Sequence, residues 1–328
     1  MLRLLSDGIG LVAMVRPSPP LTTFAQSGWH HANTTGGSGR PAPHPAPYAH
    51  ASKRGARRST AVRDRGHRLW IIGPVVLPHD DVGAGPPVLL LHAGIADRTM
   101  WAEHLRPIAE AGYRVIAMDL PGFGDAPPSP DWAEWSDVVQ TMDELSVERA
   151  ALVGNSFGGN VALRVAVLIP ERITALVLVS ARPPGMEPST ELQAAWDAEE
   201  SALEREDVDG AVAAVVDAWL RADAPPALRE RVAAMQRHAV EVQLAADDPP
   251  DEPEDPLEAN PAALERLDIP ALVTAGEFDM PDFRSGAELL AERLRHARHV
   301  VIEGAGHLAP LERPDAFRDL LIGFLRQM

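Results

Sequence analysis

The chain has 328 residues, 45% of them hydrophobic, which suffices for one large α/β domain with an insertion or for two small domains. It contains no cysteine, which excludes disulfides, thiolate metal sites and a cysteine nucleophile. The net charge is −17, but residues 1–68 hold ten Lys/Arg against two Asp, so the remainder carries a net −25. That acidic remainder should repel nucleic acids and anionic membranes, and we expect neither as a partner.

The first 66 residues have the composition of a disordered extension. They are basic, show no sustained hydrophobic period and are rich in Pro and Gly between Gly36 and Pro47. The short apolar run from Ile9 to Val15 is ended by Arg16, which disfavours a signal peptide. No apolar run approaches the length needed to span a bilayer. We therefore expect a cytoplasmic protein with residues 1–66 outside its core.

From residue 67 onward, apolar strands alternate with amphipathic helices in the segments 67–181 and 268–328. Such alternation predicts an α/β fold in which helices flank a mostly parallel central sheet. The predicted strands are Leu69–Val76, Val88–His92, Arg114–Met118, Ala150–Val153, Ile173–Ser180, Ala271–Gly276 and His299–Glu303. The predicted helices are Thr99–Ala111, Trp132–Leu145, Asn160–Leu168 and Pro314–Gln327.

The alternation stops between residues 182 and 267, where the pattern predicts about four helices. Apolar stripes run along Val208–Trp219 and Leu228–Val242, each at helical spacing. The stretch Asp247–Glu258 holds seven acids and four prolines, which predicts an exposed irregular loop. We interpret 182–267 as a helical cap inserted into the core, with residues such as Trp219 and Met235 facing the pocket beneath.

A G-x-S-x-G motif at Gly154–Gly158 lies between a predicted strand and a predicted helix, which is the context that makes Ser156 a candidate nucleophile. Small residues are needed there because strand and helix nearly touch. The helix also begins at the serine, so its free N–H groups face any anion that forms nearby. Glycine-rich turns of this kind also occur in dinucleotide-binding folds, so the motif needs support from the rest of the chain.

That support comes from an acid and a histidine in the expected chain order. A serine hydroxyl needs a base, and the base needs an acid to orient it. Asp279 follows the strand Ala271–Gly276, and His307 follows the last predicted strand. We assign Asp279 as the acid and His307 as the base, and keep Glu277 and Asp282 as alternative acids.

Together these segments resemble the α/β-hydrolase-fold serine hydrolases. The resemblance extends from about Arg68 to Met328 and is carried by residues 91–94, 119–124, 154–159, 276–279 and 304–307. It implies an oxyanion hole formed by the backbone N–H groups of Phe157 and, by position, Gly94. Ala93 stands where such enzymes usually have Gly, and we expect the neighbouring His92 to brace the loop.

The serine argues against haloalkane dehalogenases and epoxide hydrolases, which use an aspartate at this point. The segment after His307 is most similar to small esterases and enol-lactonases such as 3-oxoadipate enol-lactonase. We therefore expect an enzyme that hydrolyses a small-molecule carboxylic ester or lactone, without cofactor or metal. There are two alternatives. One is a carbon–carbon bond hydrolase of aromatic degradation, because Gly154–Gly159 resembles the turn that carries the nucleophile in those enzymes. The other is a non-catalytic ligand-binding homologue.

Substrate charge and oligomeric state are less constrained by the sequence. Arg98, near the oxyanion loop, and Arg182, at the entrance of the insertion, are the two candidates to receive a second carboxylate on the substrate. Because neither is obviously placed for that task, we favour a neutral, moderately apolar substrate. The oligomeric state stays open.

Overall fold

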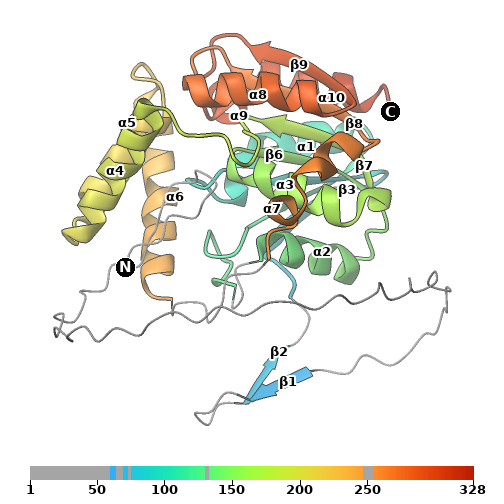
Figure 1. Cartoon of the computed structure of the whole chain (residues 1–328), viewed down its shortest axis with the longest axis horizontal. Coiled ribbons are helices and arrows are strands. Elements are labelled where there is room, and N and C mark those ends of the chain that lie inside the picture. The colour runs from blue at the N-terminus through green and yellow to red at the C-terminus, as the bar shows by residue number, and fades with distance from the viewer. Residues whose placement is uncertain (1–59, 64–68, 73–74, 130–132, 247–253) are drawn as a thin grey trace, which may run out of the picture. The chain divides into compact units, whose positions relative to one another are not determined.

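The computed structural model describes residues 60–63, 69–72, 75–129, 133–246 and 254–328 (Figure 1). The chain divides into two compact units, and the larger one contains residues 74–328. The prediction of a disordered extension over residues 1–66 falls mostly outside the described residues. Within that range, the described residues Thr60–Arg63 form a strand.

The smaller unit contains a two-stranded antiparallel sheet. Strand β1, Thr60–Arg63, pairs with strand β2, Leu69–Ile72, with Thr60 opposite Ile72. The expectation that Leu69–Val76 would be an edge strand of the central sheet is therefore wrong in its length and in its partner. A short run of residues with high strand propensity predicts a strand, but it does not predict the strand with which it pairs.

The larger unit is built on a seven-stranded sheet with strand order β3-β5-β4-β6-β7-β8-β9. Edge strand β3 is antiparallel to β5, and every other neighbouring pair is parallel. The strands are β3 His79–Gly83, β4 Pro87–Leu91, β5 Arg114–Met118, β6 Ala150–Asn155, β7 Ile173–Val179, β8 Pro270–Gly276 and β9 His296–Ile302. The predicted mostly parallel sheet is confirmed.

The central strands are apolar throughout because both faces of the sheet are covered. Side chains alternate along a strand, so Leu89 and Leu91 join the core on one face, while Val88 and Leu90 join the core on the other. The first face packs against helices α2 Glu134–Glu144, α3 Phe157–Leu168 and α8 Pro281–Arg293, and the second against α1 Ala102–Glu110 and α10 Pro314–Leu325. Three short helices complete the described core: the 3₁₀ turn η1 Arg98–Trp101, before α1, the 3₁₀ turn η2 Pro170–Arg172, before β7, and α9 Ala309–Glu312, before α10.

The chain between β7 and β8 is helical. It contains α4 Thr190–Glu204, α5 Val208–Trp219, α6 Pro226–Leu244, α7 Pro256–Ala259 and the 3₁₀ helix η3 Pro261–Arg266. In Figure 1, α4, α5 and α6 stand together at one side of the sheet. The predicted stripe on α5 is buried, from Val212 to Trp219. The boundaries 182 and 267 and the role of a cap stay predictions.

The acidic stretch before η3 differs from the irregular loop that its composition predicts. Residues 247–253 lie outside the described part, but Asp255 begins helix α7 by accepting a hydrogen bond from Leu257 N–H at 2.7 Å. Its second oxygen accepts from Arg164 Nε at 2.7 Å, and that arginine is almost fully buried on α3. The stretch therefore carries a structural ion pair that anchors the end of the insertion to the core.

No described helix has the length and apolar character needed to cross a membrane. No group of three or more described His, Asp or Glu side chains is arranged to hold a metal ion.

Among the described residues of the insertion, one acid is buried. Glu199 on α4 is 1% exposed and its Oε1 accepts a hydrogen bond from Gln236 Nε2 on α6 at 2.9 Å. Burial raises the pKa of Glu199 to about 8, because a charge there would lose its hydration. Its carboxyl group is thus largely protonated at neutral pH, which suits a position between packed helices.

Glu199 should make the stability of the protein depend on pH. A raised folded-state pKa means that the folded state holds a proton that the unfolded state has released, so stability falls as the pH rises from about 4.5 toward 8. Glu199→Gln should remove this loss and melt at a higher temperature than the wild type at pH 8.5. Glu204→Gln, at an exposed position on the same helix, is the control. A pH-independent difference between Glu199→Gln and wild type, measured by calorimetry, would contradict the prediction.

Candidate active site

Ser156 lies at the sharp turn between β6 and α3, with φ +53° and ψ −112°. For a residue with a side chain this conformation costs about 1–3 kcal/mol and needs support from its surroundings. The support is a hydrogen bond from Ser156 N–H to Val179 O on β7 at 2.7 Å, and one from Gly158 N–H to His92 O at 3.0 Å. The turn leaves Ser156 partly exposed while its neighbours are buried.

The glycines beside Ser156 are required by close contact. A Cβ on Gly154 would lie 2.2 Å from Gly158 O, and a Cβ on Gly158 would lie 2.3 Å from Leu91 O. Both distances are far inside van der Waals contact, so any side chain would force the helix away from the sheet. The sequence-based explanation of these small residues is confirmed.

The structure brings His307 and Asp279 together. His307 Nδ1 lies 2.9 Å from Asp279 Oδ1, and both residues are 5% exposed. A carboxylate only accepts hydrogen bonds, so Nδ1 is the protonated ring nitrogen and Nε2 keeps a lone pair. Met280 N–H donates to the same Oδ1 at 2.8 Å and helps to hold the carboxylate. His307 is thereby prepared to accept a proton at Nε2.

The histidine loop is tied to the residue that precedes Ser156. Asn155 Nδ2 donates to His307 O and to Val179 O, each at 3.2 Å. Two aromatic rings pack on the imidazole, Phe283 of α8 at 4.3 Å and Trp219 of α5 at 4.5 Å between ring centroids. Trp219 thus lies against the site, as expected for a residue of the insertion that faces the pocket.

The two alternative acids have other partners. Glu277 Oε2 accepts from Gly304 N–H at 2.9 Å, which braces the loop before His307. Asp282 accepts from the N–H and the hydroxyl of Ser189 at 2.7 and 2.6 Å, which fixes the start of α4. Of the three candidate acids, the structure pairs Asp279 with His307.

The two residues expected to donate to an oxyanion lie just beyond the carboxyl ends of β4 and β6, which are adjacent strands. Phe157 is the first residue of α3, and the partly exposed Gly94 follows β4. Within the described part of the chain, neither N–H donates to a protein acceptor. They are therefore available to an anion beside Ser156, but their role as an oxyanion hole stays a prediction.

His92 braces the loop, as expected. It is fully buried, its Nδ1 donates to Ala93 O at 2.8 Å and its Nε2 accepts from Leu120 N–H at 2.9 Å. Burial lowers the pKa of His92, which keeps the ring neutral and able to accept at Nε2. Both ring nitrogens are occupied, so His92 is no second base.

Arg98 is engaged in a structural ion-pair network. Its guanidinium pairs with Asp119 and with Asp125, the latter at 2.8 Å, and its N–H donates to Asp119 at 2.7 Å. Asp119 is fully buried and also accepts from Asp125 N–H at 2.9 Å. Arg98 therefore holds the loop after β5. Because its guanidinium is already paired with two aspartates, these contacts do not fit a role in binding a substrate carboxylate.

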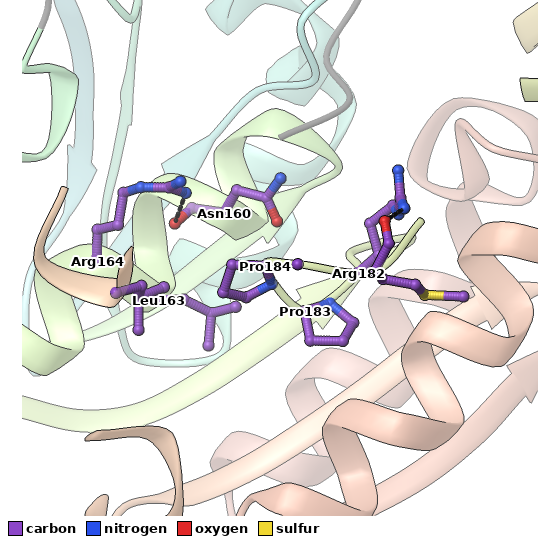
Figure 2. A pocket seen from close by; sticks show the side chains of 9 residues that line it. Asn160, Leu163, Arg164, Arg182, Pro183 and Pro184 are labelled. Atoms are coloured by element: carbon purple, nitrogen blue, oxygen red, sulfur yellow. Dashed lines mark hydrogen bonds between the residues drawn. The ribbon is translucent and has the colours of Figure 1, made fainter. Parts of the chain in front are cut away.

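Arg182 lines a narrow pocket together with Asn160 and Arg164 (Figure 2). It is 5% exposed, donates to Met186 O and forms no ion pair with any described acid. Burial lowers the pKa of this guanidinium, although Asp282 and Glu187 act in the opposite direction. Arg182 is therefore the remaining candidate for contact with an anionic group.

A strained serine between strand and helix, together with a buried histidine–aspartate pair on later loops of the same sheet, is typical of an α/β-hydrolase architecture. A family model described as the alpha/beta hydrolase fold matches residues 86–314. The chain belongs to this family, and the predicted fold class is confirmed.

Two curated relatives are hydrolases of unsaturated oxo acids by name. The chain is 28% identical over 263 residues to the 2-hydroxy-6-oxononadienedioate/2-hydroxy-6-oxononatrienedioate hydrolase of Klebsiella pneumoniae, a match that covers 75% of this chain and 89% of that enzyme. It is 37% identical over 123 residues to the 2-hydroxymuconate semialdehyde hydrolase of a Pseudomonas species, covering 35% of this chain and 44% of that enzyme. The second match thus spans less than half of the relative's length.

Solved structures of other hydrolases superimpose on the chain. A hydrolase from Pseudomonas aeruginosa has a TM-score of 0.61 at 29% identity and covers 75% of this chain and 93% of its own. The enol-lactonase from Burkholderia xenovorans has a TM-score of 0.61 at 25% identity, with 76% and 96% covered. The resemblance to enol-lactonases expected from the sequence is thereby confirmed at the level of structure.

The contacts of Arg98 predict that its loss affects stability and leaves substrate affinity unchanged. Arg98→Gln leaves the fully buried Asp119 without its cation, which should cost about 3–5 kcal/mol and lower the melting temperature by several degrees. Arg106→Gln, which removes an exposed pair with Glu110, is the control and should have little effect. An unchanged melting temperature with a raised KM would show instead that Arg98 binds substrate.

Proposed function

We propose that this protein is a serine hydrolase that cleaves a carboxylic ester or a lactone through an acyl-enzyme. The observation that carries the proposal is the 2.9 Å contact between His307 Nδ1 and Asp279 Oδ1, on a loop anchored by Asn155 directly before Ser156. The proposed nucleophile, orienting acid and base follow β6, β8 and β9 of the same sheet. The position of the chain among hydrolases of this fold supports the same conclusion.

In the proposed reaction, Ser156 Oγ attacks the substrate carbonyl carbon while His307 Nε2 takes the hydroxyl proton. Asp279 holds the imidazole in the required tautomer and stabilises its cation. The N–H groups of Phe157 and Gly94 would stabilise the negative oxygen of the tetrahedral intermediate. Collapse expels the alcohol, which receives the proton from His307 and leaves an acyl ester on Ser156. Water, deprotonated by His307, then releases the acid and restores the serine.

The surroundings of the site favour an apolar acyl or alcohol group. Trp219 and Phe283 lie against His307, and Phe157 packs on Phe123 with 5.7 Å between ring centroids. The rings of Trp219 and Phe283 exclude water from the histidine, which strengthens electrostatic interactions at the reacting carbonyl.

A carbon–carbon bond hydrolase is the second candidate, and the names of the curated relatives favour it. The same serine, histidine and aspartate would serve it. The segment after the histidine speaks for the ester or lactone instead, because Leu308–Leu311 lacks the aromatic residues that the carbon–carbon hydrolases carry there. A panel of p-nitrophenyl esters, lactones and 2-hydroxy-6-oxo-dienoic acids separates the two: preferential turnover of the last would establish the second candidate.

Loss of either proton-transferring residue should abolish hydrolysis. Ser156→Ala and His307→Ala should each retain less than a tenth of wild-type turnover of a p-nitrophenyl ester, because neither leaves an activated nucleophile. Circular dichroism checks that the variants are folded. Retention of more than a tenth by either variant would contradict the proposed triad. A wild-type protein that binds the esters without turning them over would indicate the ligand-binding alternative.

The charge of the substrate can be tested at Arg182. For a neutral substrate, the one that we favour, Arg182→Gln should leave the KM ratio between a neutral ester and a carboxylated ester of equal length unchanged. The ratio is independent of how much enzyme is folded, which matters for a residue that is 5% exposed. A selective rise of KM for the carboxylated ester would show that Arg182 binds an anionic substrate.

A further inference from the structure

The loop that carries His307 is held at nearly every backbone group. Gly304 N–H donates to Glu277, and Gly304 O accepts from Arg221 Nη1 of the insertion at 3.0 Å. Ala305 O accepts from Phe278 N–H at 2.8 Å. These contacts position the loop before the histidine, and Asn155 Nδ2 holds the carbonyl of His307 itself.

A single carboxylate holds the amides on both sides of His307. Glu312 Oε2 accepts from Gly306 N–H at 2.9 Å, and Glu312 Oε1 accepts from Leu308 N–H at 3.1 Å. Glu312 is the last residue of the short helix α9, five residues after the histidine. Leu308 N–H lies in the peptide plane that follows His307, and Gly306 N–H lies in the plane between Ala305 and Gly306, so one carboxylate restrains the backbone on both sides of the histidine.

The carboxylate of Glu312 and the end of β8 both pack closely against the loop at Gly306. A Cβ on Gly306 would lie 3.0 and 3.1 Å from the two oxygens of Glu312 and 3.1 Å from Arg221 Cγ. On the other side of the loop, a Cβ on Gly276 would lie 2.2 Å from Gly306 O. The loop is therefore confined between the end of β8 and Glu312. A larger residue at position 306 would press against the carboxylate of Glu312 and displace it.

The charge of Glu312 also bears on the histidine. The charged groups that face it are His307 and Asp279 on the side of the site and Arg221 on the side of the insertion. Burial raises the pKa of Glu312, whereas its two amide donors and His307 act in the opposite direction. Opposite charges attract, so an ionised Glu312 stabilises positive charge that develops on the imidazole during proton transfer.

We propose that Glu312 is a positioning residue for His307, which orients the imidazole through the two flanking amides and stabilises its cation through space. The proposal rests on the proposed function, since it assigns Glu312 a task in proton transfer to His307. The glutamate contacts neither Ser156 nor a reacting atom, so its effect is on the rate at which the bound substrate reacts.

Replacing Glu312 should therefore lower kcat and leave KM nearly unchanged. In Glu312→Gln the amide oxygen still accepts from one N–H, but its NH₂ group faces the other N–H, where two donors meet. A small displacement of a catalytic group costs up to about 100-fold in rate, so we expect kcat to fall by about 10–100-fold and KM to change by less than about twofold. Glu303→Gln, which removes an exposed charge next to the same loop, is the matched control and should behave as wild type.

The pH profile separates positioning from a general loss of structure. Removing a negative charge destabilises the imidazolium, so the acid limb of kcat/KM should move to lower pH in Glu312→Gln and stay in place in Glu303→Gln. Gly306→Ala, which displaces the carboxylate without removing its charge, should lower kcat with a smaller shift of the limb. Rates are divided by active sites titrated from the p-nitrophenol burst, so that unfolded protein does not count.

The outcomes are distinct. Wild-type kcat per titrated site in Glu312→Gln, with Ser156→Ala inactive, would overturn the role of Glu312 while the proposed function stands. A loss of kcat without any movement of the acid limb would overturn the electrostatic part. Equal hydrolysis by wild type and Ser156→Ala would show that the proposed function itself is wrong.

Discussion

The structure depends on the close approach of the start of α3 to the ends of β4 and β6. Gly158 donates to His92 O at 3.0 Å and has Leu91 O against the place where a side chain would be. This approach makes the turn at Ser156 sharp enough to force a positive φ, and it brings the ends of β4 and β6 to the same point. A site built on the packed ends of strands and a helix holds its geometry more precisely than a site built on loops alone.

Much of the core and of the site could be predicted because the relevant signals are local. Strands buried on both faces, such as β4, are continuous apolar runs, and the residues of the turn at Ser156 are adjacent in sequence. Strand β3 was missed because its sequence, His79–Gly83, is polar at an exposed edge. Strand β2 was assigned to the wrong sheet because pairing depends on the whole chain. The alternation of apolar and polar side chains predicts neither the polar edge strand β3 nor the strand with which β2 pairs.

Contacts between distant residues were beyond local patterns for the same reason. Asn155 and His307 are 152 positions apart, and the residues around each of them in the sequence do not predict their hydrogen bond. Arg98 looked free in the sequence, yet it is held by Asp119 and Asp125, which follow the next strand. Glu312 had a weak signal: an acid one helical turn after the first residue of α9, where free amides of the histidine loop are within reach.

The insertion meets the core through a small number of specific contacts, including Ser189 with Asp282, Arg231 with Thr99 O and Arg221 with Gly304 O. The glycines around the site, in contrast, touch backbone atoms that no repacking can move away. A mutant library aimed at new substrates should therefore diversify α4, α5 and α6 and keep Gly154, Gly158 and Gly276 constant. Recombination with insertions from other family members would need to preserve the three contacts named above, the Arg164–Asp255 ion pair, and the hydrogen bonds of His238 and Gln243 to Gly124 O and Gly122 O.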